Sequence, residues 1–471
     1  EEINDVDTET NLSLEVISSI SEKDAEKLNT LSDFNEEQMN KITMDAVQNA
    51  ENTSEDSQLI ANVVSVVNDE LINTMIEEVG KTSIEEKQSL SAKVLKAIVD
   101  TEPSKIETIS EENKDTIIKQ TIESAKDQKE GNIQDEEDLS DFVAEIIVNT
   151  DAATASKVIE EINDIETDTN LSLEVMSGIS NKDQNKLNDL SDEIKDEIEQ
   201  LAEDAVQKAE NTLEDSEKII DIVSGANTDL LNLVVEEVGD VSIDEKQSLS
   251  AKVLKGIVET EPDKMAELNE DNKNDLIESS VETARKQKEG EIVDDNENFT
   301  SSLDYTKVIT DIVTSSDSDT ATKVLEQVDN IETETDLKLD FLSELDDKAV
   351  DILSSVSSQN DEIISNLVSD AVDKVNDENN KEKLSKILNE SEGTITDKII
   401  EAANDNEKNK ETVSEALVDV AETNIDKLVE VLEGNTNANE VVEVLKDKID
   451  QEEAVTIDDF EEVFKQNVSP N

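Results

Sequence analysis

The feature that most constrains this chain is a verbatim internal repeat. The segment EKQSLSAKVLK occupies residues 86–96 and returns unchanged at 245–255. The flanking sequence repeats in the same register, since EEINDVDTETNLSLEV opens the chain and EEINDIETDTNLSLEV begins at residue 160. A third, more diverged copy begins near residue 328, shifted by an insertion near 296–302. A fixed long period is typical of repeat architectures.

We therefore predict three long repeats of about 160 residues, over 1–159, 160–325 and 326–471. Apolar residues recur at helical spacing, and each long repeat divides into four segments that read as two helices joined by a polar turn. The segments 59–80 and 142–162 show this pattern, and the turns SEKD (21–24) and DTEP (100–103) are expected to close two further hairpins. The sequence predicts an all-α fold, an α-solenoid of stacked helical hairpins of the armadillo or HEAT kind.

The repeated segment itself is expected to be a packing element. Ser89 or Ser91 would cap the start of a helix, and Leu90, Val94 and Ile98 would lie on one face of it. Pro103 would end this helix and begin the next, because the residue before a proline avoids the helical region.

Two segments, VAEIIVNTDAATASKVIEEI (143–162) and FLSELDDKAVDILSSV (341–356), follow an A-x-x-L-x-x-L-D-x-x-x-A-x-x-L-x-x-L pattern. In this they resemble the acidic helical repeats that precede the channel of MgtE-type magnesium transporters, and the related repeats of flagellar motor switch proteins. The resemblance implies a fold type and brings no functional residue with it.

The chain carries 122 acidic and 41 basic residues, a formal net charge of -81. Repulsion on this scale favours solubility and argues against nucleic acid or an anionic membrane surface as a partner. A basic protein or divalent cations remain compatible with it. No apolar run is long enough for membrane insertion. The absence of Cys together with the acidity favours an extracellular or cell-surface location on a bacterium or archaeon over a halophilic cytosol.

Catalysis has few candidate residues. The chain has no His and no Cys, the side chains most often used for acid–base and nucleophilic chemistry near neutral pH. A glycine-rich phosphate loop is also missing. We expect no enzyme activity, no catalytic residue and no cofactor.

Acidic loops at equivalent places in the three copies are candidate divalent-cation sites. DVDTETN, DIETDTN and NIETETD alternate carboxylates, whose oxygens could hold loosely bound Ca²⁺ or Mg²⁺. The alternative is an acidic loop whose polar residues cap the following helix. The candidate ligands are Asp5, Asp7, Glu9, Asp164, Glu166, Asp168, Glu332, Glu334 and Asp336. The acidic linkers IQDEED (133–138) and IVDDNEN (292–298) are expected to be solvated loops.

Aromatic residues are few and fall mostly on apolar helix stripes. They are expected in the core: Phe34, Phe142, Tyr305, Phe341, Phe460 and Phe464.

The two ends of the sequence suggest self-assembly. Glu1 aligns with Glu160, which lies inside a predicted helix, and residues 457–466 resemble the first helix of the same hairpin. We expect the ends to join copies of the chain head to tail, or to join flanking repeats of a longer chain. The predicted assembly interface consists of Glu1, Ile3, Phe460, Val463 and Phe464.

Two functions are consistent with these observations. The first is a structural repeat protein that forms an extended extracellular or cell-surface fibre by end-to-end stacking. The alternative is an α-solenoid scaffold that binds a protein partner on its concave face, and a basic protein would suit the acidic chain.

Overall fold

The computed structural model describes residues 11–85, 89–167, 169–244, 248–292, 303–345, 361–390, 394–403, 406–432, 446–448, 451 and 455–460. Within these ranges every regular element is a helix, so the predicted all-α fold is confirmed. The chain forms two compact units. Unit 1 comprises Glu1–Glu210 with Glu214–Glu237, and unit 2 comprises Asn211–Leu213 with Val238–Asn471. In the described part no helix is long and apolar enough to cross a membrane.

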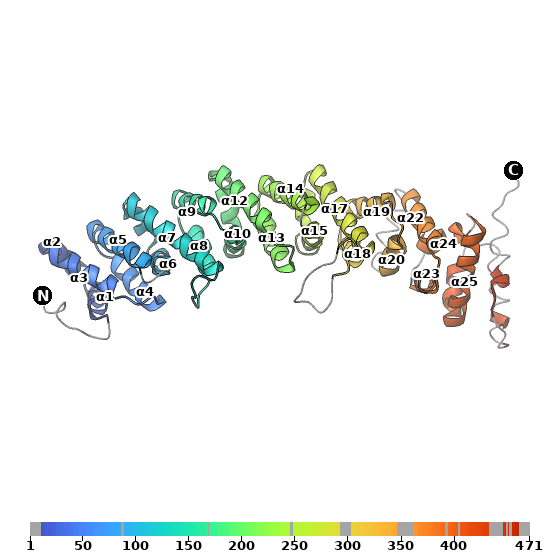
Figure 1. Ribbon diagram of the computed structural model, residues 1–471, viewed down its shortest axis with the longest axis horizontal. Helices are drawn as coiled ribbons and strands as arrows, with labels where there is room; N and C mark the ends of the chain where they lie inside the picture. Colours follow the sequence, from blue (N-terminus) through green and yellow to red (C-terminus); the bar gives the residue numbers. More distant parts are fainter. Residues whose placement is uncertain are drawn as a thin grey trace. The chain divides into compact units, whose positions relative to one another are not determined.

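Unit 1 is built from helices arranged in two layers (Figure 1). In the first layer each helix packs on the next one: α1 (Leu12–Lys23), α4 (Ser54–Val64), α6 (Leu90–Thr101), α8 (Leu139–Asn149) and α10 (Leu171–Lys182). The second layer runs in the same way through α3 (Glu36–Gln48), α5 (Asp69–Glu85), α7 (Glu111–Lys129), α9 (Ala152–Asp164) and α12 (Lys195–Lys208). The other elements that begin in or beside this unit are α2 (Ala25–Phe34), η1 (Pro103–Thr108), α11 (Gln184–Glu193), α13 (Leu213–Gly225) and α14 (Thr228–Asp244).

Unit 2 follows the same scheme. Its first layer contains α15 (Leu249–Thr260), α18 (Tyr305–Ser315), α20 (Leu337–Glu344), α23 (Glu378–Glu390) and α25 (Glu407–Thr423). The second contains α17 (Glu270–Lys288), α19 (Ser318–Asn330), α22 (Asp361–Asp373) and α24 (Thr394–Ala402). The short elements are α16 (Pro262–Glu267), α26 (Ile425–Leu432) and η2 (Ile457–Phe460). Each unit is thus a stack of helical hairpins, as an α-solenoid requires.

Residues 90–96 and 249–255 of the verbatim repeat lie in first-layer helices that are buried on almost every side. In α6 all residues from Leu90 to Val99 are buried except Lys96. Its counterpart α15 is buried in the same way from Leu249 to Leu254. A helix that contacts neighbours all round tolerates little change at any position. The repeated segment is therefore a packing element of the helix stack.

Two of the predicted turns are present, but they do not join the helices that pair across the two layers. The turns at 21–24 and 100–103 lead into the short elements α2 and η1, so that α1 is paired across the layers with α3, and α6 with α7. Asp24 caps α2 by accepting a hydrogen bond from the backbone N–H of Lys27, at 3.0 Å. The sequence of such a polar turn does not distinguish a short connecting helix from a full hairpin partner after it.

Ser89, one of the two serines expected to cap α6, has a different hydrogen-bond partner. Ser89 is the N-cap residue of α6, but its hydroxyl makes no capping hydrogen bond. The hydroxyl instead donates to Asp135 Oδ2, at 2.5 Å. Pro103 does begin the next element, η1, as expected.

The aromatic residues that the structure describes lie in the core. Phe142, Tyr305, Phe341 and Phe460 are buried, which confirms the prediction for them. The side chain of Phe34 and the whole of Phe464 lie outside what the structure describes.

Helix bounds recur with the period of the sequence. The bounds of α5, α6 and α7 return in α14, α15 and α17 at the same 159-residue shift. The two compact units, however, divide the chain near residue 237, not at the predicted limits of the long repeats. The division into 1–159, 160–325 and 326–471 therefore describes sequence duplication and stays a prediction.

Candidate functional site: lysine bridges and an acidic surface

The predicted cation loops are anchored by threonines. Thr167 Oγ1 donates to Glu130 Oε1 at 3.0 Å and lies 2.9 Å from Thr169 Oγ1. In the next copy, Thr333 Oγ1 donates to Glu289 Oε1 at 3.0 Å. These hydrogen bonds tie each loop to the end of the helix that precedes it in the stack.

The carboxylates of these loops are not gathered into a cluster by the part that the structure describes. Asp164 ends α9, and Glu166, Glu332 and Glu334 lie in the loops. Asp5, Asp7, Glu9 and Asp168 lie outside the described residues. Across the described ranges, no group of three or more His, Cys, Asp or Glu residues could hold a metal ion. Divalent-cation binding by the loops stays a prediction.

Asp336, a further candidate ligand, has a different partner. It stands at the N-cap position of α20, and Lys383 Nζ lies 2.8 Å from its Oδ2. Burial acts to raise the pKa of Asp336, but Lys383 and the more distant Lys288 hold it below its ordinary value. This carboxylate already has a cationic partner within the chain.

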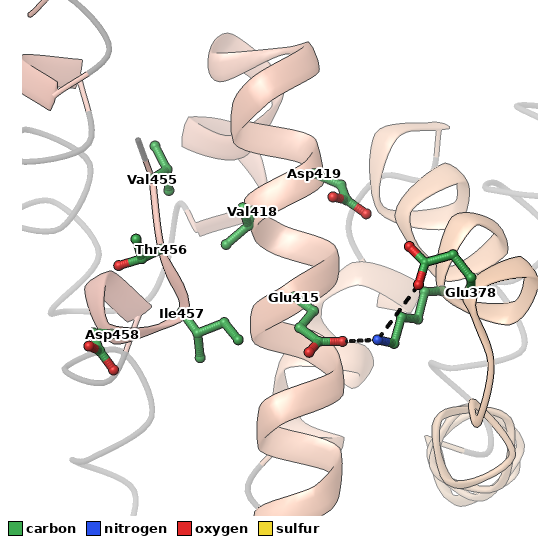
Figure 2. Close-up of a pocket in the computed structure, with 9 residues that line it drawn as sticks. Glu378, Glu415, Val418, Asp419, Val455, Thr456, Ile457 and Asp458 are labelled. Atoms are coloured by element: carbon green, nitrogen blue, oxygen red, sulfur yellow. Dashed lines mark ion pairs between the residues drawn. The ribbon is translucent and has the colours of Figure 1, made fainter. Parts of the chain in front are cut away.

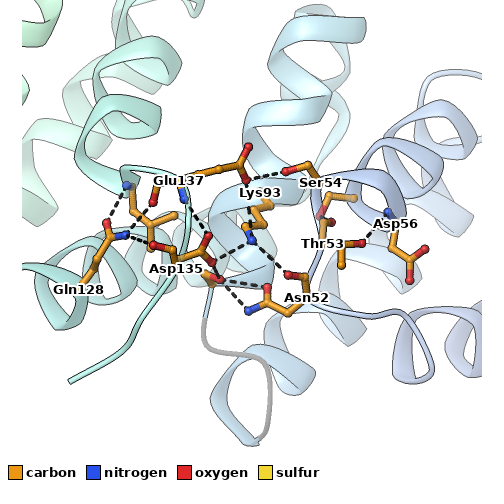
Figure 3. Close-up of polar contacts among 11 residues, drawn as sticks. Asn52, Thr53, Ser54, Asp56, Lys93, Gln128, Asp135 and Glu137 are labelled. Atoms are coloured by element: carbon orange, nitrogen blue, oxygen red, sulfur yellow. Dashed lines mark hydrogen bonds and ion pairs between the residues drawn. The ribbon is translucent and has the colours of Figure 1, made fainter. Parts of the chain in front are cut away.

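The acidic linker 133–138 is more than a solvated loop, and this prediction is corrected for Asp135. Figure 3 shows its side chain pointing toward Lys93 of α6. Lys93 Nζ lies 2.8 Å from Asp135 Oδ2, with 7% and 6% of the two side chains exposed. Lys93 also donates to the carbonyl oxygen of Asn52, at 3.1 Å.

Further hydrogen bonds hold the same linker at its far end (Figure 3). Gln128 Nε2 donates to the carbonyl oxygen of Glu137 at 2.6 Å, and Gln128 Oε1 accepts from the N–H of Leu139 at 2.8 Å. Burial acts to raise the pKa of Asp135, but hydrogen bonds from Lys93, Ser89 and the backbone hold it below its ordinary value. A buried carboxylate with these partners stays ionised at neutral pH.

Unit 2 repeats part of this arrangement. Lys252 Nζ donates to the carbonyl oxygen of Asn211 at 2.8 Å, and Ser248 Oγ donates to Asn211 Oδ1 at 2.8 Å. Gln287 Oε1 accepts from the N–H of Tyr305, also at 2.8 Å. The polar contacts are therefore part of the repeat itself and join neighbouring hairpins.

A second recurring contact places one carboxylate between two lysines. Glu174 Oε1 of α10 lies 3.1 Å from Lys129 Nζ and 2.8 Å from Lys218 Nζ, so it bridges α7 and α13. In unit 2, Asp340 of α20 contacts Lys288 and Lys383 in the same way. We call these two groups the lysine bridges.

Other lysines also join successive helices of the first layer. Lys96 Nζ of α6 lies 3.3 Å from Glu145 Oε2 of α8, and 5.2 Å from the centre of the Phe142 ring. Lys182 Nζ of α10 lies 2.9 Å from Asp141 Oδ1, again on α8. Each such contact contributes only tenths of a kcal/mol to about 1 kcal/mol, but the contacts recur along the stack.

These lysine contacts between helices were not predicted from the sequence. Their partners lie 32–53 residues apart in the chain, as between Lys338 and Asp370 or Lys323 and Glu270. The sequence does show that a lysine recurs at the same position of the repeat, as at Lys129 and Lys288. Because most lysines of the described part are used between helices, the charge that remains toward solvent is mainly negative.

The α7–α9 face of unit 1 is one place where this negative charge gathers. Burial raises the pKa of Glu161, Lys119 counteracts this, and the carboxylates of Asp164, Asp115 and Glu123 raise it further. Mutual repulsion of this kind is relieved when a cation binds nearby.

Unit 2 contains a cavity of about 520 Å³ beside α25. Figure 2 shows Ile457 reaching toward α25, with Glu378 on the other side of that helix. Lys381 is paired with Glu415 and lies 4.0 Å from Glu378 Oε2. The lining mixes carboxylates and apolar side chains with one paired lysine.

Among the residues of the predicted assembly interface, the structure describes only Phe460. Phe460 is fully buried, and η2, which contains it, packs on α25. A side chain in this position belongs to the core of unit 2. Glu1, Ile3, Val463 and Phe464 lie outside the described residues.

No family model matches the chain, and no curated protein is similar to it in sequence. Solved structures that match over most of its length are helical repeat proteins. Human Puf-A is 12% identical, with 96% of this chain and 98% of that chain covered and a TM-score of 0.26. Importin beta is 11% identical over 99% of this chain and 69% of that chain, with a TM-score of 0.21. APUM23 with GGAAUUGACGG is 10% identical over 91% and 96%, with a TM-score of 0.25.

These matches agree with a helical repeat fold and, at such TM-scores, support no transfer of a site. None of them shows the resemblance to MgtE-type transporters or motor switch proteins. Two expectations are corrected. The exclusion of nucleic acid is withdrawn, because the matched structures include APUM23 with GGAAUUGACGG. The extracellular or cell-surface location is also withdrawn, and no location is assigned to the chain.

Proposed function

We propose that the chain is a non-enzymatic helical-repeat scaffold that binds a protein partner through a cationic segment. The observation that carries this proposal is the placement of the lysines. Lys93, Lys218 and Lys383 are engaged between neighbouring helices, which leaves carboxylates as the main charged groups toward solvent. A surface of this kind attracts a partner of opposite charge and orients it.

The α7–α9 face is the place where the proposal is tested most sharply. The carboxylates of Glu123 and Asp164 each raise the pKa of Glu161 there, after the larger effect of burial. A lysine-rich segment laid along this face would relieve their repulsion and release counterions. We expect the binding to weaken steeply as salt is raised.

End-to-end assembly into a fibre has less support. Phe460, the one described member of the expected interface, is buried within its own chain. The scaffold proposal needs no such contact.

The test is titration of the full chain with a fluorescent lysine-rich peptide. A variant with Glu123→Gln, Glu161→Gln and Asp164→Asn is compared with a control in which the exposed residues Glu55, Glu107 and Glu193 become Gln. Both variants lose three negative charges, so a difference between them reports location and not net charge. We expect the first variant to bind several-fold more weakly than the control.

Two results would overturn the proposal. Equal weakening in both variants would mean that the peptide senses only the net charge. Tighter binding of a single-stranded RNA of sequence GGAAUUGACGG than of the peptide would point to a nucleic-acid partner instead.

A further inference from the structure

An exposed lysine lies in the middle of the α7–α9 face, where we place the cationic partner. Lys119 of α7 comes four residues after Asp115 and four before Glu123, so the three side chains follow one another along the same side of the helix. All three are exposed. A cation at this place acts against the binding of a cationic segment, because like charges repel.

The contacts of Lys157 show how α7 and α9 are aligned. Helix α9 packs on α7, and Lys157 Nζ lies 2.7 Å from Glu111 Oε2 and 2.6 Å from Asp115 Oδ1. Helix α8 returns the chain between them, so α7 and α9 run in the same direction. One helical turn further along both helices come Lys119 on α7 and Glu161 on α9.

The electrostatics of Glu161 agree with this alignment. Glu161 is half-buried, and burial raises the pKa of its carboxyl group. The charge of Lys119 is the next largest influence and lowers that pKa, whereas Asp164, Asp115 and Glu123 raise it. Lys119 therefore stabilises the ionised form of Glu161, and it does so from an exposed position.

Unit 2 differs from unit 1 at both members of this pair. Lys323 of α19 contacts Glu270 of α17, so the corresponding two helices are aligned in the same way. One turn further along, Glu278 and Gln327 stand in place of the lysine and the glutamate. The lysine is thus absent from the copy in which the glutamate is absent, which indicates that the two residues act as a pair.

We propose that Lys119 is a built-in competitor, which a cationic partner must displace from Glu161. The inference rests on the function proposed above and refines it. With Lys119 in place, Glu123 and Asp164 are the carboxylates of this face that we assign to the partner. Once Lys119 is displaced, Glu161 becomes available to it one turn away.

This arrangement specifies the spacing of the cations in the partner. Residues four apart in an α-helix lie about 6 Å apart along its axis. In an extended segment, alternate side chains point to the same side and are about 6.4–6.8 Å apart. The partner that gains most is therefore an extended segment with lysines at alternate positions, one for Glu123 and Asp164 and the next for Glu161.

The test is titration of the full chain with a fluorescent peptide that has lysine at every second position. Lys119→Gln removes the competitor, and Lys41→Gln, which changes an exposed lysine of α3, is the control with the same net charge. We expect Lys119→Gln to bind the peptide roughly two- to five-fold more tightly than the control, the range of an exposed ion pair. In chains that also carry Glu161→Gln, most of this gain should be lost. An equal gain in both backgrounds would overturn the proposal, because Lys119 would then act only through its charge.

A measurement without peptide separates this inference from the proposed function. Titration of the Glu161 carboxyl group by nuclear magnetic resonance should give a higher pKa in Lys119→Gln than in the parent chain, and no change in Lys41→Gln. An unchanged pKa in Lys119→Gln would overturn the inference.

Two further outcomes show which of the two proposals fails. If the triple variant of the face binds more weakly than its control, but Lys119→Gln and Lys41→Gln bind equally, the inference is overturned and the proposed function stands. Equal weakening of the triple variant and its control would overturn both.

Discussion

Lys93 Nζ lies 2.8 Å from Asp135 Oδ2, and both side chains are almost completely buried. The two residues belong to different elements, α6 and the linker before α8, so the pair fixes the linker against the helix stack. A buried ion pair does not by itself make a fold more stable, because both ions lose their water. Removing only one partner, however, leaves the other charge buried without compensation.

The first prediction concerns this pair. Lys93→Met should lower the free energy of unfolding by about 2–3 kcal/mol, because Asp135 would remain buried without its cation. Urea unfolding followed by far-ultraviolet circular dichroism measures the change. Lys41→Met is the matched control, since Lys41 is exposed, and should stay within about 0.5 kcal/mol of the parent chain.

The second prediction concerns pH. The pKa of Asp135 is held below its ordinary value in the folded chain, so its ionised form adds stability at neutral pH. This contribution is present above the unfolded pKa, about 3.9, and is lost as the pH falls through the lower folded pKa. Asp135→Asn should therefore be less stable than the parent at pH 7, and the difference should shrink below about pH 4. A constant difference across that range would contradict the assignment.

The third prediction compares the two lysine bridges. Asp340 exposes 10% of its side chain and Glu174 exposes 25%, although both lie between two lysines. Asp340→Asn should therefore cost more than Glu174→Gln, about 2 kcal/mol against less than about 1 kcal/mol. Hydrogen exchange of α20 and α10 measures the two local effects. The reverse order would show that burial does not govern the strength of these bridges.

The fourth prediction concerns the acidic loops. Sodium chloride should raise the melting temperature by screening the net charge of -81. If the loops hold divalent cations, calcium chloride at matched ionic strength should raise it further, and Asp164→Asn with Glu332→Gln should remove the excess. Equal melting temperatures in the two salts would mean that both salts act only by screening the charge.

Much of the fold can be predicted from the sequence, because helical periodicity and a verbatim repeat are local signals. The bounds of α6 and α15 follow directly from them. The hairpin limits at α2 and η1 were missed, because a turn such as the one at Asp24 caps a short helix as readily as a long one.

The polar contacts could not be predicted, because they depend on packing between hairpins. Ser89 carries a capping signal, yet its hydroxyl is taken by Asp135, 46 residues away. Lys338 lies among acidic residues in the sequence, yet it is buried and pairs with Asp370 of α22, 32 residues away. Neither partner is visible until the helices are stacked.

Most lysines of the described part serve between helices of the stack, and we propose that this leaves an acidic surface for a partner. Acetylation of the folded full chain with limiting reagent, read out by mass spectrometry at each lysine, tests it most directly. Lys93, Lys252 and Lys338 are buried, whereas Lys41, Lys119 and Lys307 are exposed. The account predicts that the buried set reacts at least roughly ten-fold more slowly, because local opening must come first. Equal rates in the two sets would contradict it.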